Sequence, residues 1–369
     1  MQYYYRYRSD SMVSIKELIY HELYLGTVDE NNDPYDSFQP YEFPANHDMW
    51  VNLIKIALER SKLGKAVSTE AIDRMAGYAC AHSPMSIPEA LLFDYARKSG
   101  ALAFLGLEIN HAIWRFIKEY EPSNGYFAAF SKTGSDPLMW YHYASMYKGY
   151  CLIFKPFAGR IQVKGKIGHY AGNSFPLEDV VYQDDVIKDD AFLLFPQAVS
   201  NLSLSQEEID QLNERKYKYY RTKAKCWDYE QEARVVYTEN IRWLTGDLDD
   251  IPSYERLLHY NPDHLVGVIL GPRMNPAVRE QVIHAVKKVQ EEKWDKSEGR
   301  RVLFDMVIHE AKLSTNKKEL EIVPQMIINP IKTLLPGDPQ FEECYSKWRD
   351  HIAMEFTESG SGNGYHVID

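Results

Sequence analysis

The stretch 225–237, KCWDYEQEARVVY, constrains the fold most, because it combines a strand-like pattern with charged side chains. Successive side chains of a strand point to opposite faces of its sheet. On this pattern Glu230, Glu232 and Arg234 share one face, and the other face is mostly apolar. We therefore expect a strand whose apolar face packs on a core and whose charged face lies toward solvent or a cleft.

The charged face allows two interpretations. Two carboxylates one pleat apart repel each other, so one of them has a raised pKa unless a cation lies nearby, and Arg234 is the nearest candidate. Alternatively, the residues form a solvated Glu–Arg ladder that contributes little to stability. The pattern alone favours the solvated ladder.

Composition narrows the classes of protein. The chain has 369 residues, which suggests one elaborated domain or two. A net charge of -11 argues against broad binding to a nucleic-acid backbone. The four cysteines are scattered without a CxxC pair, which is typical of reduced thiols rather than disulfides or a zinc site. The polar N-terminus does not resemble a signal peptide, and no apolar run is long enough for a bilayer, so we expect a cytoplasmic protein without a membrane segment.

Alternating apolar runs and helical patterns predict an α+β fold. We expect a mixed, twisted and split β-sheet with a helical insertion and flanking helices. The expected parts are a core domain of residues 1–48 and 123–330, a helical insertion at 49–122, a C-terminal helical extension at 331–357 and a disordered Gly/Ser-rich tail at 358–369.

Two local patterns bear on a site. Asp33 and Asp36 lie in a turn sequence, NNDPYD, where capping the turn is the simplest role for both. Asp136 and Pro137 predict the start of a helix that carries Trp140 and neighbouring aromatic residues on one stripe. Core packing is the simplest explanation of such a stripe.

Several motifs, in order, carry a family resemblance: YRYR, NDPYD, MWYHYA followed by GYCLIF, WDYEQEARVV, and VGVILGPRM. They span residues 3–313 and resemble the bacterial domain of unknown function family twenty-nine seventy-one. The helical block at 49–120 is bulkier than that family leads us to expect. The resemblance implies a fold and the position of a site, but no reaction.

A second likeness is to ADP-ribosyltransferases. Arg6 or Arg8 corresponds to the arginine on their first strand, and the motif Glu230-Gln231-Glu232 to their late Glu-x-Glu or Gln-x-Glu. Ser131-Lys132-Thr133 corresponds loosely to their middle Ser-Thr-Ser, from which it departs.

The second likeness implies NAD as a substrate and assigns roles to the motif residues. Glu232 would stabilise positive charge on the ribose, and Glu230 would orient or deprotonate the acceptor. An arginine would grip the pyrophosphate, and an aromatic ring would stack on the cationic nicotinamide. Arg234 would keep the carboxylates ionised. The implied NAD-binding residues are Arg6, Arg8, Ser131, Trp140, His142, Tyr143 and Arg234.

Three functions follow as hypotheses. The first is an NAD-consuming ADP-ribosyltransferase or NAD glycohydrolase, a bacterial toxin or defence effector with a protein or nucleic-acid acceptor and no metal. The second is a non-catalytic module that senses a nucleotide or a protein. The third is a metal-dependent nuclease that uses the carboxylates Asp33, Asp36, Glu230 and Glu232. The opposing structural account pairs Arg6 and Arg8 with the two glutamates across neighbouring strands.

Overall fold

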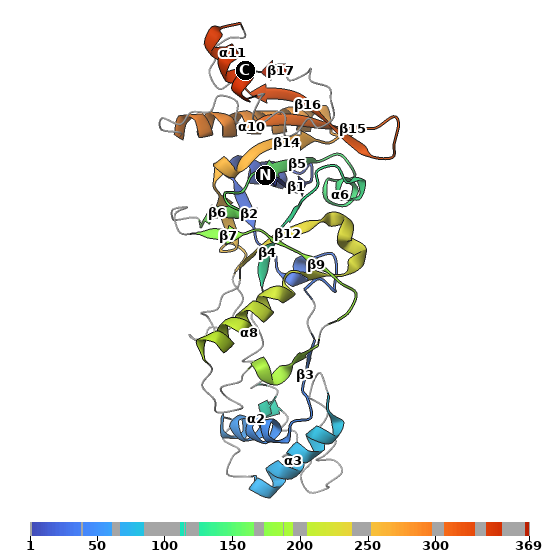
Figure 1. The fold of residues 1–369 in the computed structure, drawn as a ribbon, viewed down its shortest axis with the longest axis vertical. Coiled ribbons are helices and arrows are strands. Elements are labelled where there is room, and N and C mark those ends of the chain that lie inside the picture. The colour runs from blue at the N-terminus through green and yellow to red at the C-terminus, as the bar shows by residue number, and fades with distance from the viewer. Residues whose placement is uncertain are drawn as a thin grey trace.

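A mixed nine-stranded sheet forms the centre of the computed structural model, in the order β17-β16-β15-β14-β5-β1-β4-β12-β8 (Figure 1). The central strand β1 is antiparallel to both of its neighbours, whereas β14 and β15 are parallel. A smaller sheet has the order β2-β13-β6-β7. These mixed sheets and the surrounding helices confirm the α+β class.

The structure describes residues 2–37, 40–60, 67–84, 111–113, 115, 125–165, 173–186, 188–194, 205–237, 252–296, 306–328, 337–348 and 366–368. The strands are β1 Tyr4–Arg8, β2 Glu22–Tyr24, β3 Tyr41–Glu42, β4 Tyr126–Ser131, β5 Tyr150–Phe154, β6 Arg160–Lys164, β7 Ser174–Pro176, β8 Glu178–Asp179, β9 Val181–Tyr182, β10 Asp189–Asp190, β11 Thr222–Lys223, β12 Glu232–Tyr237, β13 Leu257–Tyr260, β14 Leu265–Leu270, β15 Val307–Leu313, β16 Leu320–Ile328 and β17 His366–Ile368. The α-helices are α1 Met12–Tyr20, α2 His47–Arg60, α3 Thr69–His82, α6 Pro137–Tyr143, α8 Gln206–Tyr219, α10 Pro276–Lys296 and α11 Pro339–Trp348, and the 3-10 helices are η1 Val28–Glu30, η4 Ala191–Leu194, η5 Lys225–Glu230 and η6 Pro262–His264.

Helices cover the two faces of the central sheet. On one face, Ile15 and Leu18 of α1 and Val286 of α10 join the largest hydrophobic cluster. On the other face, Met139 and Trp140 of α6 pack in a separate cluster. Because side chains alternate along each strand, the two faces have different cores and carry different polar residues.

Helix α6 begins as its sequence predicts. The carboxylate of Asp136 accepts hydrogen bonds from the backbone N–H groups of Leu138 and Met139, at 2.8 and 3.0 Å, and Pro137 is the first helical residue. Beyond the helix, residues 145–147 all have positive φ angles, between 48° and 72°. This left-handed turn leads the chain to Gly149 and into β5.

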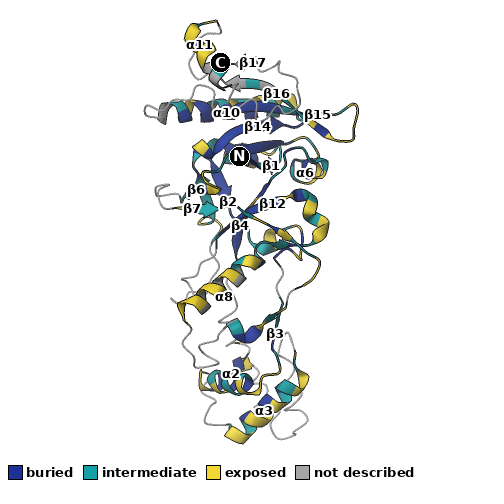
Figure 2. Cartoon of the chain, viewed as in Figure 1, coloured by how far each residue is buried: buried dark blue, intermediate teal, exposed yellow. Residues whose placement is uncertain are grey.

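The helices α2 and α3 form a hydrophobic cluster of their own, which includes Trp50, Phe43 and Phe192. This unit lies at the end of the molecule opposite α11, and its contact surface between helices is buried (Figures 1 and 2). Most of the helices expected between residues 86 and 120 lie outside the described residues. In the described part of the chain, no helix is both long and apolar enough to cross a membrane.

The expected disorder at 358–369 is wrong for residues 366–368. These residues form β17, which pairs in parallel with β16. The backbone hydrogen bonds of an edge strand hold them, and side-chain composition alone does not reveal such pairing. The rest of that tail lies outside the described residues, and α11 falls within the predicted extension 331–357.

We predict opposite effects for two glycine substitutions. A Cβ at Gly149 would collide with the carbonyl oxygen of Arg8, whereas a Cβ at Gly77 in α3 meets nothing within 4 Å. Gly149→Ala should lower the free energy of unfolding by about 1–3 kcal/mol. Gly77→Ala should raise it by about 0.5–1 kcal/mol, because glycine is a poor helix former. Urea denaturation measures both, and equal stability of the two variants would contradict the close approach at Gly149.

Candidate functional site

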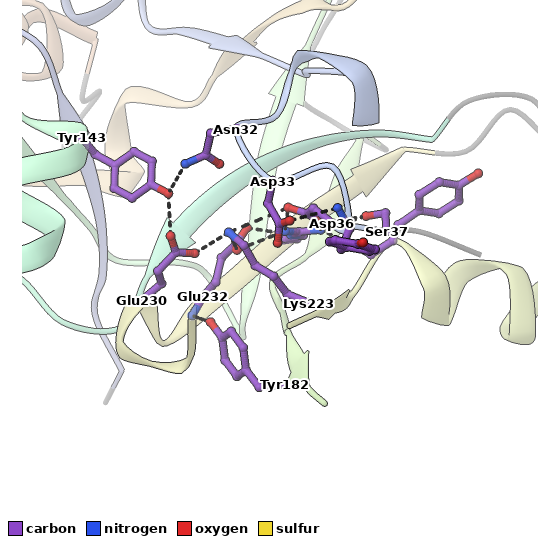
Figure 3. A network of polar contacts seen from close by, with 12 residues as sticks. Asn32, Asp33, Asp36, Ser37, Tyr143, Tyr182, Lys223, Glu230 and Glu232 are labelled. Atoms are coloured by element: carbon purple, nitrogen blue, oxygen red, sulfur yellow. Dashed lines mark hydrogen bonds and ion pairs between the residues drawn. The ribbon is translucent and has the colours of Figure 1, made fainter. Parts of the chain in front are cut away.

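A buried polar network lies where β11, η5, β12 and the loop after η1 meet (Figure 3). Its charged members are Asp36, Lys223, Glu230, Glu232 and Arg234. Each of these five residues is at most 4% exposed. The charged face of the 225–237 stretch is therefore buried within the protein, and the expectation of a solvated Glu–Arg ladder is wrong.

Arg234 is the most buried member, with no exposed surface. Its Nη1 and Nη2 donate to the two carboxylate oxygens of Asp36 at 2.8 and 2.7 Å. Its Nε and Nη2 donate to the two oxygens of Glu232 at 2.6 and 3.1 Å. The guanidinium also lies 4.0 Å from the centre of the Phe127 ring. A planar fork of donors suits two bidentate carboxylates, and a lysine could not replace it.

Lys223 links the second half of the network. Its Nζ donates to Glu230 Oε2 at 2.5 Å and to Glu232 Oε2 at 3.3 Å, and it lies 3.8 Å from Asp36 Oδ2. Burial alone would lower the pKa of Lys223, but the charges of Glu232 and Glu230 raise it above its ordinary value. Lys223 is therefore a fixed cation in this site.

Glu230 is the last residue of η5 rather than part of the strand. Gln231, with a left-handed φ of 44°, turns the chain between Glu230 and β12. Tyr143 Oη donates to Glu230 Oε1 at 2.5 Å, and the exposed Asn32 donates from Nδ2 to Tyr143 Oη at 3.2 Å. The expected strand thus begins only at Glu232, and the 3-10 turn brings Glu230 into the network by a different route.

The two glutamates have pKa values shifted in opposite directions. Burial raises the pKa of Glu230 above its ordinary value, against the lowering effects of Lys223 and Tyr143. Burial would also raise the pKa of Glu232, but the charge and hydrogen bonds of Arg234, with Lys223, lower it. Paired carboxylates whose pKa values are driven apart are typical of acid–base sites.

Backbone contacts fix the turn that carries Glu230. Ser131 Oγ donates to the carbonyl oxygen of Glu230 at 2.6 Å, and the N–H of Lys132 donates to Gln231 at 2.9 Å. The N–H of Glu232 donates to Tyr182 Oη at 2.7 Å. Ser131 therefore lies beside the network, as expected, but its hydroxyl binds main chain.

The expected meeting of the N-terminal arginines with the two glutamates is wrong. Tyr5, Ser131 and Glu232 are successive partners across β1, β4 and β12, so they share one face of the sheet. Arg6 and Arg8 alternate with Tyr5 and lie on the opposite face. Arg6 donates to the carbonyl oxygen of Ala129 at 3.0 Å.

Arg8 forms an ion pair with Glu17 of α1. The alternative in which Arg6 and Arg8 pair with the two glutamates across neighbouring strands is also wrong. Strand β4 lies between β1 and β12, so these strands are not neighbours.

The three residues with aromatic rings that the sequence proposed for NAD binding lie in different surroundings. Trp140 is fully buried, and its Nε1 donates to the carbonyl oxygen of Gly134 at 2.9 Å, so it cannot stack on a ligand. Tyr143 reaches Glu230, as described above. His142 is exposed, and its ring centre lies 6.4 Å from those of Trp227 and Tyr229.

Sequence reasoning missed Lys223 and gave Asp36 too small a role. Asp33 does cap the turn, because its Oδ1 accepts the N–H of Tyr35 at 2.9 Å. Asp36 instead binds Arg234 across the network. The only sequence signal for this role was the position of Asp36 in the NDPYD motif, and nothing in the local pattern distinguished Lys223 from neighbouring lysines.

Two cations occupy the carboxylates that a metal would need. Arg234 and Lys223 bind the oxygens of Asp36 and Glu232, and Lys223 also binds Glu230. Among the described residues there is no group of three or more His, Cys, Asp or Glu side chains that could hold a metal ion. The geometry therefore does not favour the nuclease hypothesis.

Comparison with known families gives a match to part of the chain. Residues 139–235 match the family model described as "Protein of unknown function (DUF2971)", which confirms the family resemblance. The matched segment contains Tyr143, Lys223 and the Glu230–Arg234 stretch, whereas Asp36 precedes it. No curated protein and no solved structure matches the chain. The likeness to ADP-ribosyltransferases receives no support from these comparisons.

We predict that the network makes a large contribution to stability through Arg234. Arg234→Met would leave Asp36 and Glu232 buried with less compensating charge and should lower the free energy of unfolding by about 3–5 kcal/mol. The control is Lys132→Met, which removes a more exposed ion pair with Asp179 at 2.8 Å and should cost less than about 1 kcal/mol. Similar losses in the two variants, measured by urea denaturation, would contradict the role of Arg234.

Proposed function

We propose that the network is the catalytic centre of an enzyme that breaks the N-glycosidic bond of NAD. The ADP-ribosyl group would pass to water or to a nucleophilic acceptor. The observation that carries the proposal is the opposite shift of the two glutamate pKa values, with Glu230 raised and Glu232 lowered. Site chemistry, rather than family membership, supports this function.

Glu230 would act as the general base. The bond between ribose C1′ and the nicotinamide nitrogen breaks, and its electron pair leaves with nicotinamide. Water attacks the positively charged C1′ and gives a proton to Glu230, so the products are ADP-ribose and nicotinamide. A carboxylate with a raised pKa accepts a proton more readily near neutral pH than an ordinary one does.

The charge balance of the network favours this reaction. Three carboxylates, Asp36, Glu230 and Glu232, face the two cations Lys223 and Arg234, which leaves excess negative charge when all three are ionised. A fixed negative charge stabilises the positive charge that develops on ribose in the transition state. Glu232 would act as a positioning residue, because its oxygens bind Arg234 and Lys223.

Access to Glu230 requires a local movement. Glu230 is 2% exposed, and Tyr143 covers its Oε1. Asn32, which binds Tyr143, is exposed. The substrate would displace Asn32 and move Tyr143 away from Glu230 Oε1.

A second candidate is a nucleotide-binding module without catalysis. Both carboxylate oxygens of Glu230 already accept hydrogen bonds within the protein, which is the arrangement expected of a purely structural glutamate. In that case the neutral isostere at position 230 would preserve the function of the protein.

We predict that the protein releases nicotinamide from NAD and that Glu230→Gln slows the release by about 100-fold or more, because the base is lost. The wild-type rate should rise with pH as Glu230 ionises, with its inflection above the ordinary glutamate value of 4.5. Nicotinamide is measured by chromatography after incubation with NAD, with and without bacterial lysate as a source of acceptors.

Asp228→Asn is the matched control, since Asp228 is an exposed carboxylate in the same 3-10 helix. It should release nicotinamide at the wild-type rate. Absence of release by the wild type under every condition, or equal rates in Glu230→Gln and wild type, would exclude the catalytic proposal and leave the binding module.

A further inference from the structure

A continuous band of aromatic side chains runs along the surface from the network to the start of α10. Its members are His142, Trp227, Tyr229, Tyr141 and Tyr147, which we name the aromatic band. All five are half-buried or exposed, and Tyr141 is 49% exposed. The band consists of side chains from α6, the turn that follows it, and η5, which packs against α6.

The rings follow one another at contact distance. Tyr147 lies 6.5 Å from Tyr141, and Tyr141 lies 5.3 Å from His142, measured between ring centres. Trp227 and Tyr229 lie 6.0 Å apart at the end that adjoins Glu230. The left-handed turn places Tyr147 at the opposite end. Tyr141 and His142 are exposed, whereas Tyr147, Trp227 and Tyr229 are half-buried. A group of aromatic rings that reaches the surface over this extent is typical of a surface that binds a ligand.

Cations without a carboxylate partner accompany the band. The Arg273 guanidinium lies over the Tyr147 ring at 5.3 Å, and the backbone N–H of Arg273 donates to the carbonyl oxygen of Tyr147 at 3.1 Å. Lys148 follows Tyr147 in the chain, and Lys225 precedes the two rings of η5. All three side chains are exposed, and among the described residues none of them forms an ion pair. At the η5 end of the band the exposed carboxylate Asp228 lies between Trp227 and Tyr229, close to Lys225 in the chain. Arg273 and Lys148 at the Tyr147 end therefore favour an anionic group there, in a protein whose net charge is -11.

We infer that the aromatic band binds the purine ring of a nucleoside diphosphate on Tyr141, with the diphosphate against Arg273 and Lys148. Every nucleobase has a flat face that stacks on aromatic rings, and guanidinium groups bind phosphate oxygens through paired donors. The inference rests on the proposed function for one point only: the nucleotide at this site would be the adenosine diphosphate part of the NAD substrate.

A single-stranded nucleic acid would also stack on aromatic rings. It requires in addition a groove of many cations along its phosphates, which gives such binding its strong dependence on salt. The band has three free cations among the described residues, and the net charge of -11 opposes a polyanion. A small nucleotide fits these charges better.

The test is titration calorimetry of the full chain with ADP, adenosine and inorganic pyrophosphate. The variants are Tyr141→Ala and Arg273→Ala. Their controls are Tyr254→Ala, an aromatic residue that is 73% exposed outside the band, and Lys55→Ala, an exposed cation on α2. All four positions are exposed, so circular dichroism should match the wild type.

We expect ADP to bind the wild type and to lose about tenfold in affinity in each band variant, whereas the controls bind as the wild type does. Adenosine should respond only to Tyr141→Ala, and pyrophosphate only to Arg273→Ala. No ADP binding at concentrations up to about 1 mM, or unchanged affinity in both band variants, would overturn the inference. Tighter binding of a single-stranded oligonucleotide than of ADP would also overturn it.

The test of nucleotide binding can be separated from the test of the proposed reaction. Glu230→Gln should bind ADP as the wild type does, because Glu230 does not touch this part of the ligand. ADP binding without nicotinamide release would support the band and exclude the reaction. Nicotinamide release with an unchanged KM for NAD in Tyr141→Ala and Arg273→Ala would support the reaction and exclude nucleotide binding by the aromatic band.

Discussion

The pairing of Arg234 with Asp36 and Glu232 is the interaction on which the rest of the site depends. A fully buried guanidinium is tolerated because two carboxylates satisfy its donors in planar geometry. The contact joins a loop near the N-terminus to a central strand almost two hundred residues later. Removing water from the charges costs free energy, so the benefit of the pairing lies as much in fixing the geometry as in adding stability.

The same pairing separates the properties of the two glutamates. Arg234 holds Glu232 ionised, whereas Glu230 has only Lys223, shared with its neighbour, and the hydroxyl of Tyr143. Burial therefore dominates at Glu230 and raises its pKa. Two acids that are two positions apart in the sequence become a fixed anion and a group that can exchange a proton. The left-handed Gln231 makes this possible, since it takes Glu230 off the strand and turns it toward Tyr143.

Periodicity predicted much of the fold, because strands such as β5 and β14 are runs of apolar residues and helices such as α6 begin at a recognisable cap. The α+β class and the helix opened by Asp136 both follow from such local signals. Local sequence signals did not predict the composition of the site in the same way. Alternation placed Glu232 and Arg234 on one face, but it could not show that the loop at Asp36 and the strand at Lys223 cover that face. The order of strands, with β4 between β1 and β12, is a long-range property, and it separates Arg6 and Arg8 from the acids.

The central claim is that Glu230 titrates above an ordinary glutamate while its neighbour Glu232 does not. The most direct measurement is a pH titration of side-chain carboxyl carbons by NMR in protein labelled at glutamate, with the Glu230 signal assigned by its loss in Glu230→Gln. We expect that signal to titrate above 4.5, and to move further upward in Tyr143→Phe, because the hydrogen bond from Tyr143 favours the ionised form. A Glu230 signal that titrates at or below 4.5 would contradict the account.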